Sequence, residues 1–375
     1  MKLFDVYPLY NVTPVSAKGI VVTDDKGQEY LDFYGGHAVI SIGHSHPHYT
    51  KRLKDQLDQI GFYSNSIKNP LQEELAKKLG QLSGCPDYNL FMCNSGAEAN
   101  ENALKMASFQ TGKSRVIAFA NSFHGRTSAA VAATDNPKIN APINQQQKVT
   151  FLSFEDIEAF KKEIEKGDVC AVILEAIQGV GGLDEPSTRF YQTMAQLCKE
   201  HGVLLIADEV QSGFGRSGKF FAFQHHGIQP DIISIAKGMG NGFPVAGVLI
   251  HESIKASYGM LGTTFGGNHL ACVATLAVLE VLENKDLLEN ATAMGKYFTE
   301  KAKTIPQVKR VKGQGLMLGL EFDFEVADLR KRLIFNQHMF TGGAKDKHVL
   351  RFLPALNITR EHLDVFFEAL KAELV

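Results

Sequence analysis

The chain has 375 residues, of which 44% are hydrophobic and 21% are charged, and its formal net charge is −2. This composition is typical of a soluble globular protein with two domains, and it is not basic enough to indicate nucleic acid as a partner. No stretch approaches 18 consecutive apolar residues, so no membrane span is predicted. The opening MKLFDVYPLY lacks the apolar run of a secretory signal and the arginine bias of a transit peptide.

The five cysteines are scattered and form no C-x-x-C pair: Cys85, Cys93, Cys170, Cys198 and Cys272. An odd, unpatterned set fits free thiols in a reducing compartment better than disulfides or a zinc site. We therefore expect a cytoplasmic protein without a structural metal ion.

The first part of the chain predicts a β-hairpin over residues 17–34, with a turn at DDKG. Apolar runs then predict seven strands, at 89–94, 115–120, 149–154, 170–177, 203–210, 231–237 and 245–250. Between them, apolar residues at helical spacing predict helices that end near glycines, at 100–112, 155–168 and 188–202. Alternation of this kind indicates an α/β fold, with a mostly parallel seven-stranded sheet covered by helices on both faces.

The C-terminal part has α+β character. One long helix is predicted over 269–305, followed by a strand at 315–322, a helix, a TGG turn and a strand at 348–354. The economical division is a large domain of residues 50–258 and a smaller domain built from both termini, 1–49 and 259–375.

Two glycine-containing stretches imitate nucleotide-binding motifs. Residues 107–114, ASFQTGKS, are one residue away from a P-loop, but a helix ends there and a strand follows, which is the reverse of a phosphate cradle. Residues 313–319, GQGLMLG, open a strand rather than a helix, so they predict a turn and not a dinucleotide site.

The stretch NSGAEANE, residues 94–101, follows a predicted strand and opens a helix. Small residues and free backbone N–H groups at a helix start can bind an anion such as phosphate. The same residues also suit a simple capped helix, with Ser95 as the N-cap and Glu98 completing a capping box.

Two charged residues follow buried strands of the same predicted sheet. Asp208 ends LLIAD, and Lys237 ends DIISIAK about one βα unit later. Taken singly, Asp208 could cap a turn and Lys237 could extend to solvent. Together with the anion site, they suit pyridoxal 5′-phosphate: phosphate on the helix, ring nitrogen on Asp208, and aldehyde on Lys237 as a Schiff base.

The sequence resembles the class III, fold-type-I pyridoxal-phosphate aminotransferases, and within them the acetylornithine/succinylornithine aminotransferases. The resemblance spans nearly the whole chain, through the blocks YLDFYGGHAV, GHSHP, NSGAEANE, SFHGRT, ILEAIQG, LLIADEVQSGFGRSG, PDIISIAKGMGNGFP, TTFGGNHLAC and LRFLPAL. It implies transfer of the terminal amine of an N-acylornithine to 2-oxoglutarate, as in arginine biosynthesis, by a homodimer with shared active sites.

The resemblance also assigns roles to single residues. The cofactor phosphate would lie on Ser95, Gly96 and Ala97, and Thr264 would bind the phosphate of the neighbouring subunit. The ring would lie between Phe123 and Val210, with Asp208 on its nitrogen, Gln211 on its hydroxyl and Lys237 on its aldehyde. Arg126 and Thr263 would hold polar groups of the acylornithine, and Arg351 would take the α-carboxylate of glutamate or 2-oxoglutarate.

Two positions depart from the family pattern. Val180 stands where relatives carry a glutamate that pairs with the arginine matching Arg351. His37 stands where relatives carry an apolar residue or a tyrosine, near the substrate tail. We hypothesise that these changes favour a donor with an extra anionic group, such as N-succinylornithine; neutral drift is the alternative.

Other functions fit parts of the pattern. Ornithine, 4-aminobutyrate or a related ω-amine is the alternative donor. A protein of this fold that binds pyridoxal phosphate without turnover is a further alternative, although it would not need the substrate arginines Arg126 and Arg351.

Overall fold

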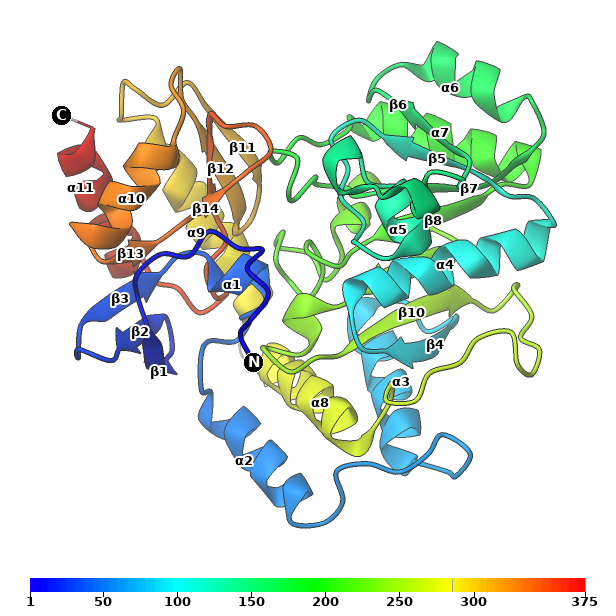
Figure 1. Cartoon of the computed structure of the whole chain (residues 1–375), viewed down its shortest axis with the longest axis horizontal. Helices are drawn as coiled ribbons and strands as arrows, with labels where there is room; N and C mark the ends of the chain where they lie inside the picture. Colours follow the sequence, from blue (N-terminus) through cyan, green and yellow to red (C-terminus); the bar gives the residue numbers. More distant parts are fainter. Residues whose placement is uncertain (285, 375) are drawn as a thin grey trace.

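A computed structural model describes residues 1–284 and 286–374, and Figure 1 shows two lobes with the N-terminus lying between them. The larger lobe is built on a seven-stranded sheet in the order β4-β10-β9-β8-β7-β5-β6. These strands are β4 Tyr88–Cys93, β10 Ala246–His251, β9 Ile232–Ile235, β8 Leu204–Asp208, β7 Val169–Leu174, β5 Arg115–Phe119 and β6 Val149–Leu152. β10 is antiparallel to both neighbours and the other pairs are parallel, which confirms the predicted sheet.

The helices of this lobe follow from capping and apolar spacing. α7, Thr188–His201, starts at the N-cap Ser187, buries one stripe of side chains, and ends at Gly202 in the left-handed conformation (φ 61°). Glycine is favoured there because it adopts positive φ at little steric cost. The other helices are α3 Pro70–Ser83, α4 Gly96–Thr111, α5 Ser128–Ala132 and α6 Ile157–Ile164.

The smaller lobe joins the two ends of the chain. One sheet, β1-β2-β3-β13, pairs the N-terminal β3 in parallel with the C-terminal β13, and a second has the order β11-β12-β15-β14. Its strands are β1 Pro14–Lys18, β2 Val21–Asp24, β3 Glu29–Asp32, β11 Arg310–Gln314, β12 Met317–Glu321, β13 Met339–Phe340, β14 Gly342–Gly343 and β15 Val349–Phe352. β2 and β3 form the predicted hairpin, whereas β1, β11, β13 and β14 were not predicted. The predicted TGG turn is wrong at Gly342–Gly343, because these residues form β14, which pairs with β15.

The predicted single helix over 269–305 is wrong, because two helices lie there. α8, His269–Asn284, packs on α2, Pro47–Leu57, and on α3. α9, Leu287–Ala302, instead packs on β11 and on α11, Arg360–Glu373. Apolar residues recur at helical spacing on both sides of the break. This pattern therefore does not indicate that the two helices pack against different elements. Lys285, between them, lies outside the described residues.

Both predictions for the glycine-containing stretches are confirmed: a helix end followed by a strand at 107–114, and a turn at 313–319. α4 ends at Thr111, Gly112 adopts φ 67°, and β5 begins at Arg115. The second stretch is the tight connection between β11 and β12, where both strands pair in antiparallel register. Neither turn leads into a helix, so neither presents the N–H groups of a phosphate cradle.

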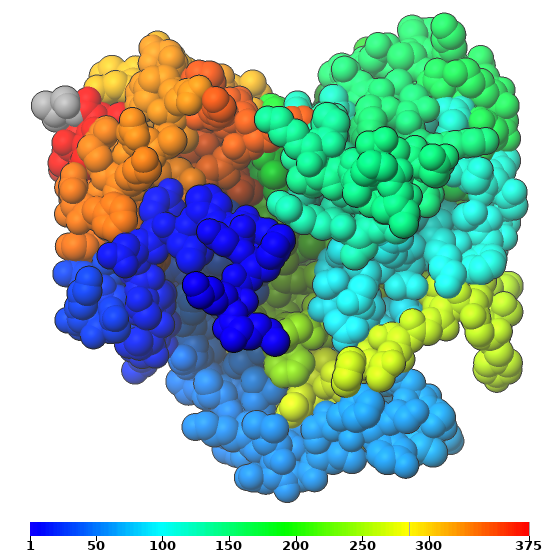
Figure 2. All heavy atoms as spheres, viewed as in Figure 1, coloured from blue at the N-terminus to red at the C-terminus, as the bar shows by residue number. Residues whose placement is uncertain are grey.

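The surface is hollowed between the two lobes, and the N-terminal segment crosses the front of this hollow (Figure 2). The first residues of that segment are largely exposed, including Leu3 and Phe4. Among the described residues, none of the helices has the length and apolar character needed to cross a bilayer.

Candidate active site

A cavity of about 450 Å³ opens at the carboxyl ends of β4, β8 and β9. This is the edge at which ligands bind in open α/β sheets. The structure gathers most of the predicted cofactor and substrate residues here, namely Ser95, Gly96, Ala97, Phe123, Arg126, Asp208, Val210, Gln211 and Lys237. Val180 also lines this cavity.

Lys237 lines this cavity, and its backbone has a positive φ angle, which is uncommon for a residue other than glycine. β9 ends at Ile235, two residues earlier than the predicted strand, and Lys237 begins a single 3-10 turn with φ 49°. Burial lowers the pKa of its amine to about 8, since the nearby carboxylates of Asp208 and Glu175 only partly offset the desolvation. An amine with this pKa is partly neutral near pH 7, which is its nucleophilic form.

Asp208 ends β8 and is 4% exposed, so its carboxylate needs partners. Its Oδ1 accepts a hydrogen bond from the Val210 N–H at 3.0 Å. Its Oδ2 accepts one from Asn100 Nδ2 at 2.8 Å and lies 2.7 Å from Nδ1 of the buried His124. These contacts match what an ionised carboxylate requires away from water, so Asp208 can face a positively charged ligand atom.

The start of α4 is both a capped helix and a close-packed surface. Ser95 Oγ accepts a hydrogen bond from the Glu98 N–H, which confirms Ser95 as the N-cap. A Cβ on Gly96 would stand 2.6 Å from Cγ1 of Val210, so only glycine lets the start of α4 and the loop after β8 approach so closely. Gly96 and Ala97 line the cavity, and the first N–H groups of a helix have no partner within the helix.

Glu175, which sequence analysis missed, organises the loops beside the cavity. Its carboxylate accepts hydrogen bonds from the N–H groups of Phe123, at 2.9 Å, and Gly179, at 2.7 Å. Burial raises the pKa of Glu175. Its place at the end of the buried strand run CAVIL, in the quoted block ILEAIQG, is the signal that could have identified it.

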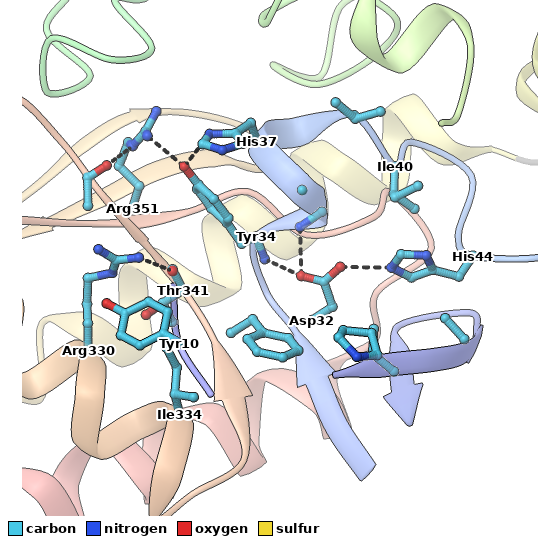
Figure 3. Close-up of a pocket in the computed structure, with 18 of the residues that line it drawn as sticks. Tyr10, Asp32, Tyr34, His37, Ile40, His44, Arg330, Ile334, Thr341 and Arg351 are labelled. Atoms are coloured by element: carbon cyan, nitrogen blue, oxygen red, sulfur yellow. Dashed lines mark hydrogen bonds and ion pairs between the residues drawn. The ribbon is translucent and has the colours of Figure 1, made fainter. Parts of the chain in front are cut away.

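A second cavity of about 950 Å³ adjoins the first, with Val39 lining both, and Figure 3 shows its residues. Arg351 on β15 is 3% exposed there and donates to neutral acceptors: the Gly343 carbonyl at 2.6 Å, the Gly179 carbonyl at 2.8 Å and Tyr34 Oη at 2.8 Å. Among the described residues, no carboxylate forms an ion pair with this guanidinium. It is therefore suited to bind one from a ligand.

His37 is connected to this arginine through Tyr34. Tyr34 Oη lies 2.7 Å from His37 Nδ1, and Figure 3 shows the three side chains in a row. Burial and the neighbouring cations, first Arg351 and then Lys237, lower the pKa of His37 to about 4. The imidazole is therefore neutral near pH 7, with one ring nitrogen carrying a hydrogen and the other able to accept a hydrogen bond.

His37 is also connected to the first cavity, through Gln211. It sits in a left-handed turn with φ 68°, and its carbonyl accepts a hydrogen bond from Gln211 Nε2 at 3.2 Å. The Asp32 carboxylate fixes this turn, because its Oδ1 accepts the N–H groups of Tyr34 and Gly35. The predicted residues His37, Gln211 and Arg351 thus belong to one connected region.

Thr263 and Thr264 are not brought to this region within one chain. Thr263 lines a separate cavity of about 310 Å³, where its Oγ1 accepts the Gly266 N–H at 3.0 Å. Thr264 is exposed. The role implied for Thr264 lies in a neighbouring subunit, which a single chain does not contain.

The residues present fit pyridoxal 5′-phosphate. The N–H groups at the start of α4 suit its phosphate, and the donor-stabilised Asp208 suits a protonated ring nitrogen. The Lys237 amine, with its lowered pKa, suits an aldehyde. Phe123 and Val210 line the same cavity and can enclose a flat ring between them.

Known proteins resemble this chain along nearly its whole length. It is 42% identical to acetylornithine aminotransferase from Bacillus subtilis over 96% of this chain and 94% of the relative. It is 41% identical to acetylornithine aminotransferase from Aquifex aeolicus, covering 96% of each. Among solved structures, ornithine aminotransferase from Toxoplasma gondii has a TM-score of 0.90 at 27% identity, covering 98% of this chain and 91% of that one.

The sequence profile of the aminotransferase class-III family matches residues 6–374. The match therefore includes every strand end that carries a cavity residue. The chemistry of the cavity agrees with the extent of this match, with the shared fold and with the full-length relatives. The chain belongs to the class-III aminotransferases and has the fold and the pyridoxal 5′-phosphate cofactor of that family.

Proposed function

We propose that this protein transfers the terminal amine of N-acetylornithine to 2-oxoglutarate, which gives N-acetylglutamate semialdehyde and glutamate. The observation that carries the proposal is the lysine of lowered pKa beside Asp208 and near the buried Arg351. Full-length relatives at 38–42% identity that are named acetylornithine aminotransferase support this choice of donor. A place in arginine biosynthesis is part of the same proposal.

When bound, pyridoxal phosphate supplies an aldehyde that combines with amines and a ring that takes up the electron pair of a broken C–H bond. The Lys237 amine, with a pKa of about 8, would remove the proton from the donor carbon that bears the nitrogen and return a proton during the reverse half-reaction. Asp208 would hold a proton on the ring nitrogen. Glu175 would keep Phe123 in place through the Phe123 N–H.

The acceptor's α-carboxylate would bind Arg351. Its guanidinium is held by carbonyls and by Tyr34, so it is oriented without being neutralised. Arg126, which is exposed and lines the first cavity, would bind a polar group of the donor. N-Succinylornithine remains the predicted alternative donor from His37 and Val180, and a neutral His37 supplies a hydrogen-bonding group but no charge.

We also propose that the active protein is a cytoplasmic homodimer. Phe62 and Phe265 are 44% and 61% exposed and lie 5.5 Å apart between ring centroids, next to the exposed Tyr63 and Thr264. An exposed apolar group of this kind suits a subunit interface. All five cysteines are buried and free, which suits a reducing compartment.

A donor panel with 2-oxoglutarate as acceptor, measured by the glutamate formed, tests the proposed activity. N-Acetylornithine is expected to give the highest kcat/KM among N-acetylornithine, N-succinylornithine, ornithine and 4-aminobutyrate. A higher value for N-succinylornithine would support the hypothesis on His37 and Val180, whereas ornithine or 4-aminobutyrate in first place would overturn the assignment of the donor.

The matched control in this panel is Lys237→Ala, which removes the amine and leaves the phosphate site. We expect it to bind cofactor without measurable turnover. Wild-type protein that binds cofactor but forms no glutamate from any donor would instead favour a non-catalytic binding protein.

A further inference from the structure

Asn100 lies at the centre of the cavity wall, and sequence analysis gave it no role. It is 1% exposed and stands one turn after Gly96 on α4. Its Nδ2 donates to the His124 carbonyl at 2.7 Å and to Asp208 Oδ2 at 2.8 Å. Its Oδ1 accepts the Ser234 hydroxyl at 2.6 Å. A single amide thus contacts three separate segments of the chain.

The orientation of this amide is dictated by its neighbours. A carboxylate and a carbonyl can only accept hydrogen bonds, so both must face the NH₂ group of Asn100. The Ser234 hydroxyl then donates to the oxygen. Exchanging the amide's nitrogen and oxygen would set Oδ1 against two other acceptors, which is strongly unfavourable for buried groups.

The three segments are those that present the cofactor residues. Asp208 and Ser234 are direct partners across β8 and β9, and Lys237 follows Ser234 by three residues. The His124 carbonyl belongs to the loop that carries Phe123. α4 itself begins at the predicted phosphate site. Asn100 therefore connects the parts that would hold the phosphate, the ring face, the ring nitrogen and the aldehyde.

The geometry points to Asn100 as a positioning residue, which fixes Oδ2 of Asp208 so that the carboxylate meets the ring nitrogen of the cofactor. This inference rests on the proposed role of Asp208. Without the amide, Oδ2 loses one of its two side-chain partners and the carboxylate can turn about its last torsion. The ring nitrogen would then lose part of its counter-charge, while the phosphate site at Gly96 would stay intact.

The test compares two cofactors on the protein freed of its own cofactor. Pyridoxal 5′-phosphate is titrated beside its 1-deaza analogue, in which a carbon replaces the ring nitrogen, and Kd is measured by absorbance. Asn100→Ala is expected to raise Kd for pyridoxal phosphate about tenfold, which is the order expected for one hydrogen bond to a charged group. Kd for the deaza analogue should change less than twofold, because that analogue has no nitrogen for Asp208 to meet.

Three variants make the result decisive. Asn102→Ala, two residues further along α4, removes an amide that donates to the Glu98 carbonyl, and it should change neither Kd. Asp208→Ala should raise Kd for pyridoxal phosphate but not for the deaza analogue, as is expected for Asn100→Ala. Ser234→Ala keeps the Asn100 side chain but frees its oxygen, so it should give a smaller effect of the same kind and serves if Asn100→Ala does not fold.

If Asn100→Ala raises Kd equally for both cofactors, its role is merely structural and the inference is overturned. The inference is also overturned if Asn100→Ala changes neither Kd. If Asp208→Ala also fails to distinguish the two cofactors, the proposed role of Asp208 is wrong. If Asp208→Ala distinguishes them and neither Asn100→Ala nor Ser234→Ala does, only the inference on Asn100 fails.

Discussion

At the scale of single residues, the site depends on how the surroundings of Lys237 and Asp208 affect the two ionisable groups. Lys237 loses water on burial and its pKa falls to about 8. Asp208 is only 4% exposed but is surrounded by hydrogen-bond donors, from Asn100, Val210 and His124. A partly neutral amine and a hydrogen-bonded carboxylate can therefore lie in one cavity, and pyridoxal phosphate chemistry needs both.

The pH dependence of cofactor capture follows from the Lys237 amine. Since burial lowers its pKa from 10.5 to about 8, the neutral form grows as pH rises through about 8 and is nearly complete well below 10.5. The rate of covalent capture of pyridoxal phosphate by the cofactor-free protein, followed by absorbance, should rise with a midpoint near pH 8 and then level off. Lys237→Ala should show no covalent capture at any pH. A rate that climbs steadily to pH 10.5 would contradict the lowered pKa.

At the scale of secondary-structure elements, close approach between α4 and the loop after β8 shapes the cavity. Gly96 opens α4, and Val210 follows β8 by two residues. A Cβ on Gly96 would stand 2.6 Å and 3.1 Å from the two methyl groups of Val210. The helix start and the ring-facing valine therefore touch because one of them lacks a side chain.

This contact predicts the effect of Gly96→Ala. The added methyl group should displace Val210 or the first turn of α4, which costs about 1–3 kcal/mol of stability and weakens cofactor binding about tenfold. Thermal unfolding and a cofactor titration measure the two effects. Val210→Ala in the same chain should restore most of the stability by making room for the methyl group, and Val210→Ala alone serves as the control. If Gly96→Ala alone unfolds at the wild-type temperature and binds the cofactor with the wild-type Kd, the close packing is contradicted.

At the scale of the whole molecule, one chain holds most but not all of the predicted site. Thr264 is exposed and lies outside both the catalytic cavity and the Arg351 cavity. The exposed pair Phe62 and Phe265 lies in the same region. If Thr264 completes the site of a second copy, each active site needs residues from two chains.

Mixing variants tests this sharing. A Lys237→Ala chain and a Thr264→Ala chain, combined in equal amounts and assembled at random, form a mixed dimer in half of all dimers. One of its two sites then has both Lys237 and Thr264 intact, so about one quarter of all sites are wild-type. Assayed at limiting cofactor, the mixture should therefore exceed the average of the separate variants. Activity equal to that average would mean that Thr264 serves its own chain or no site.

Much of the fold could be predicted from the sequence, because local rules determined it. Buried strands read as apolar runs, and helices ended at glycines that tolerate positive φ, as at Gly112 and Gly202. The seven-stranded sheet was predicted on this basis. The break between α8 and α9 was not, since both helices carry apolar residues at helical spacing but bury them against different parts of the molecule.

The fold class, the sheet and the residue types at the strand ends, including Asp208 and Lys237, could be predicted from the amino-acid sequence. Which side chains contact one another became known only from the packed structure. Asn100, Glu175 and Tyr34 lie far apart in the chain from their partners Asp208, Phe123 and Arg351, and no local pattern encodes such contacts. The physical reason is that charge state and hydrogen-bond partners depend on burial, which arises when distant segments pack together.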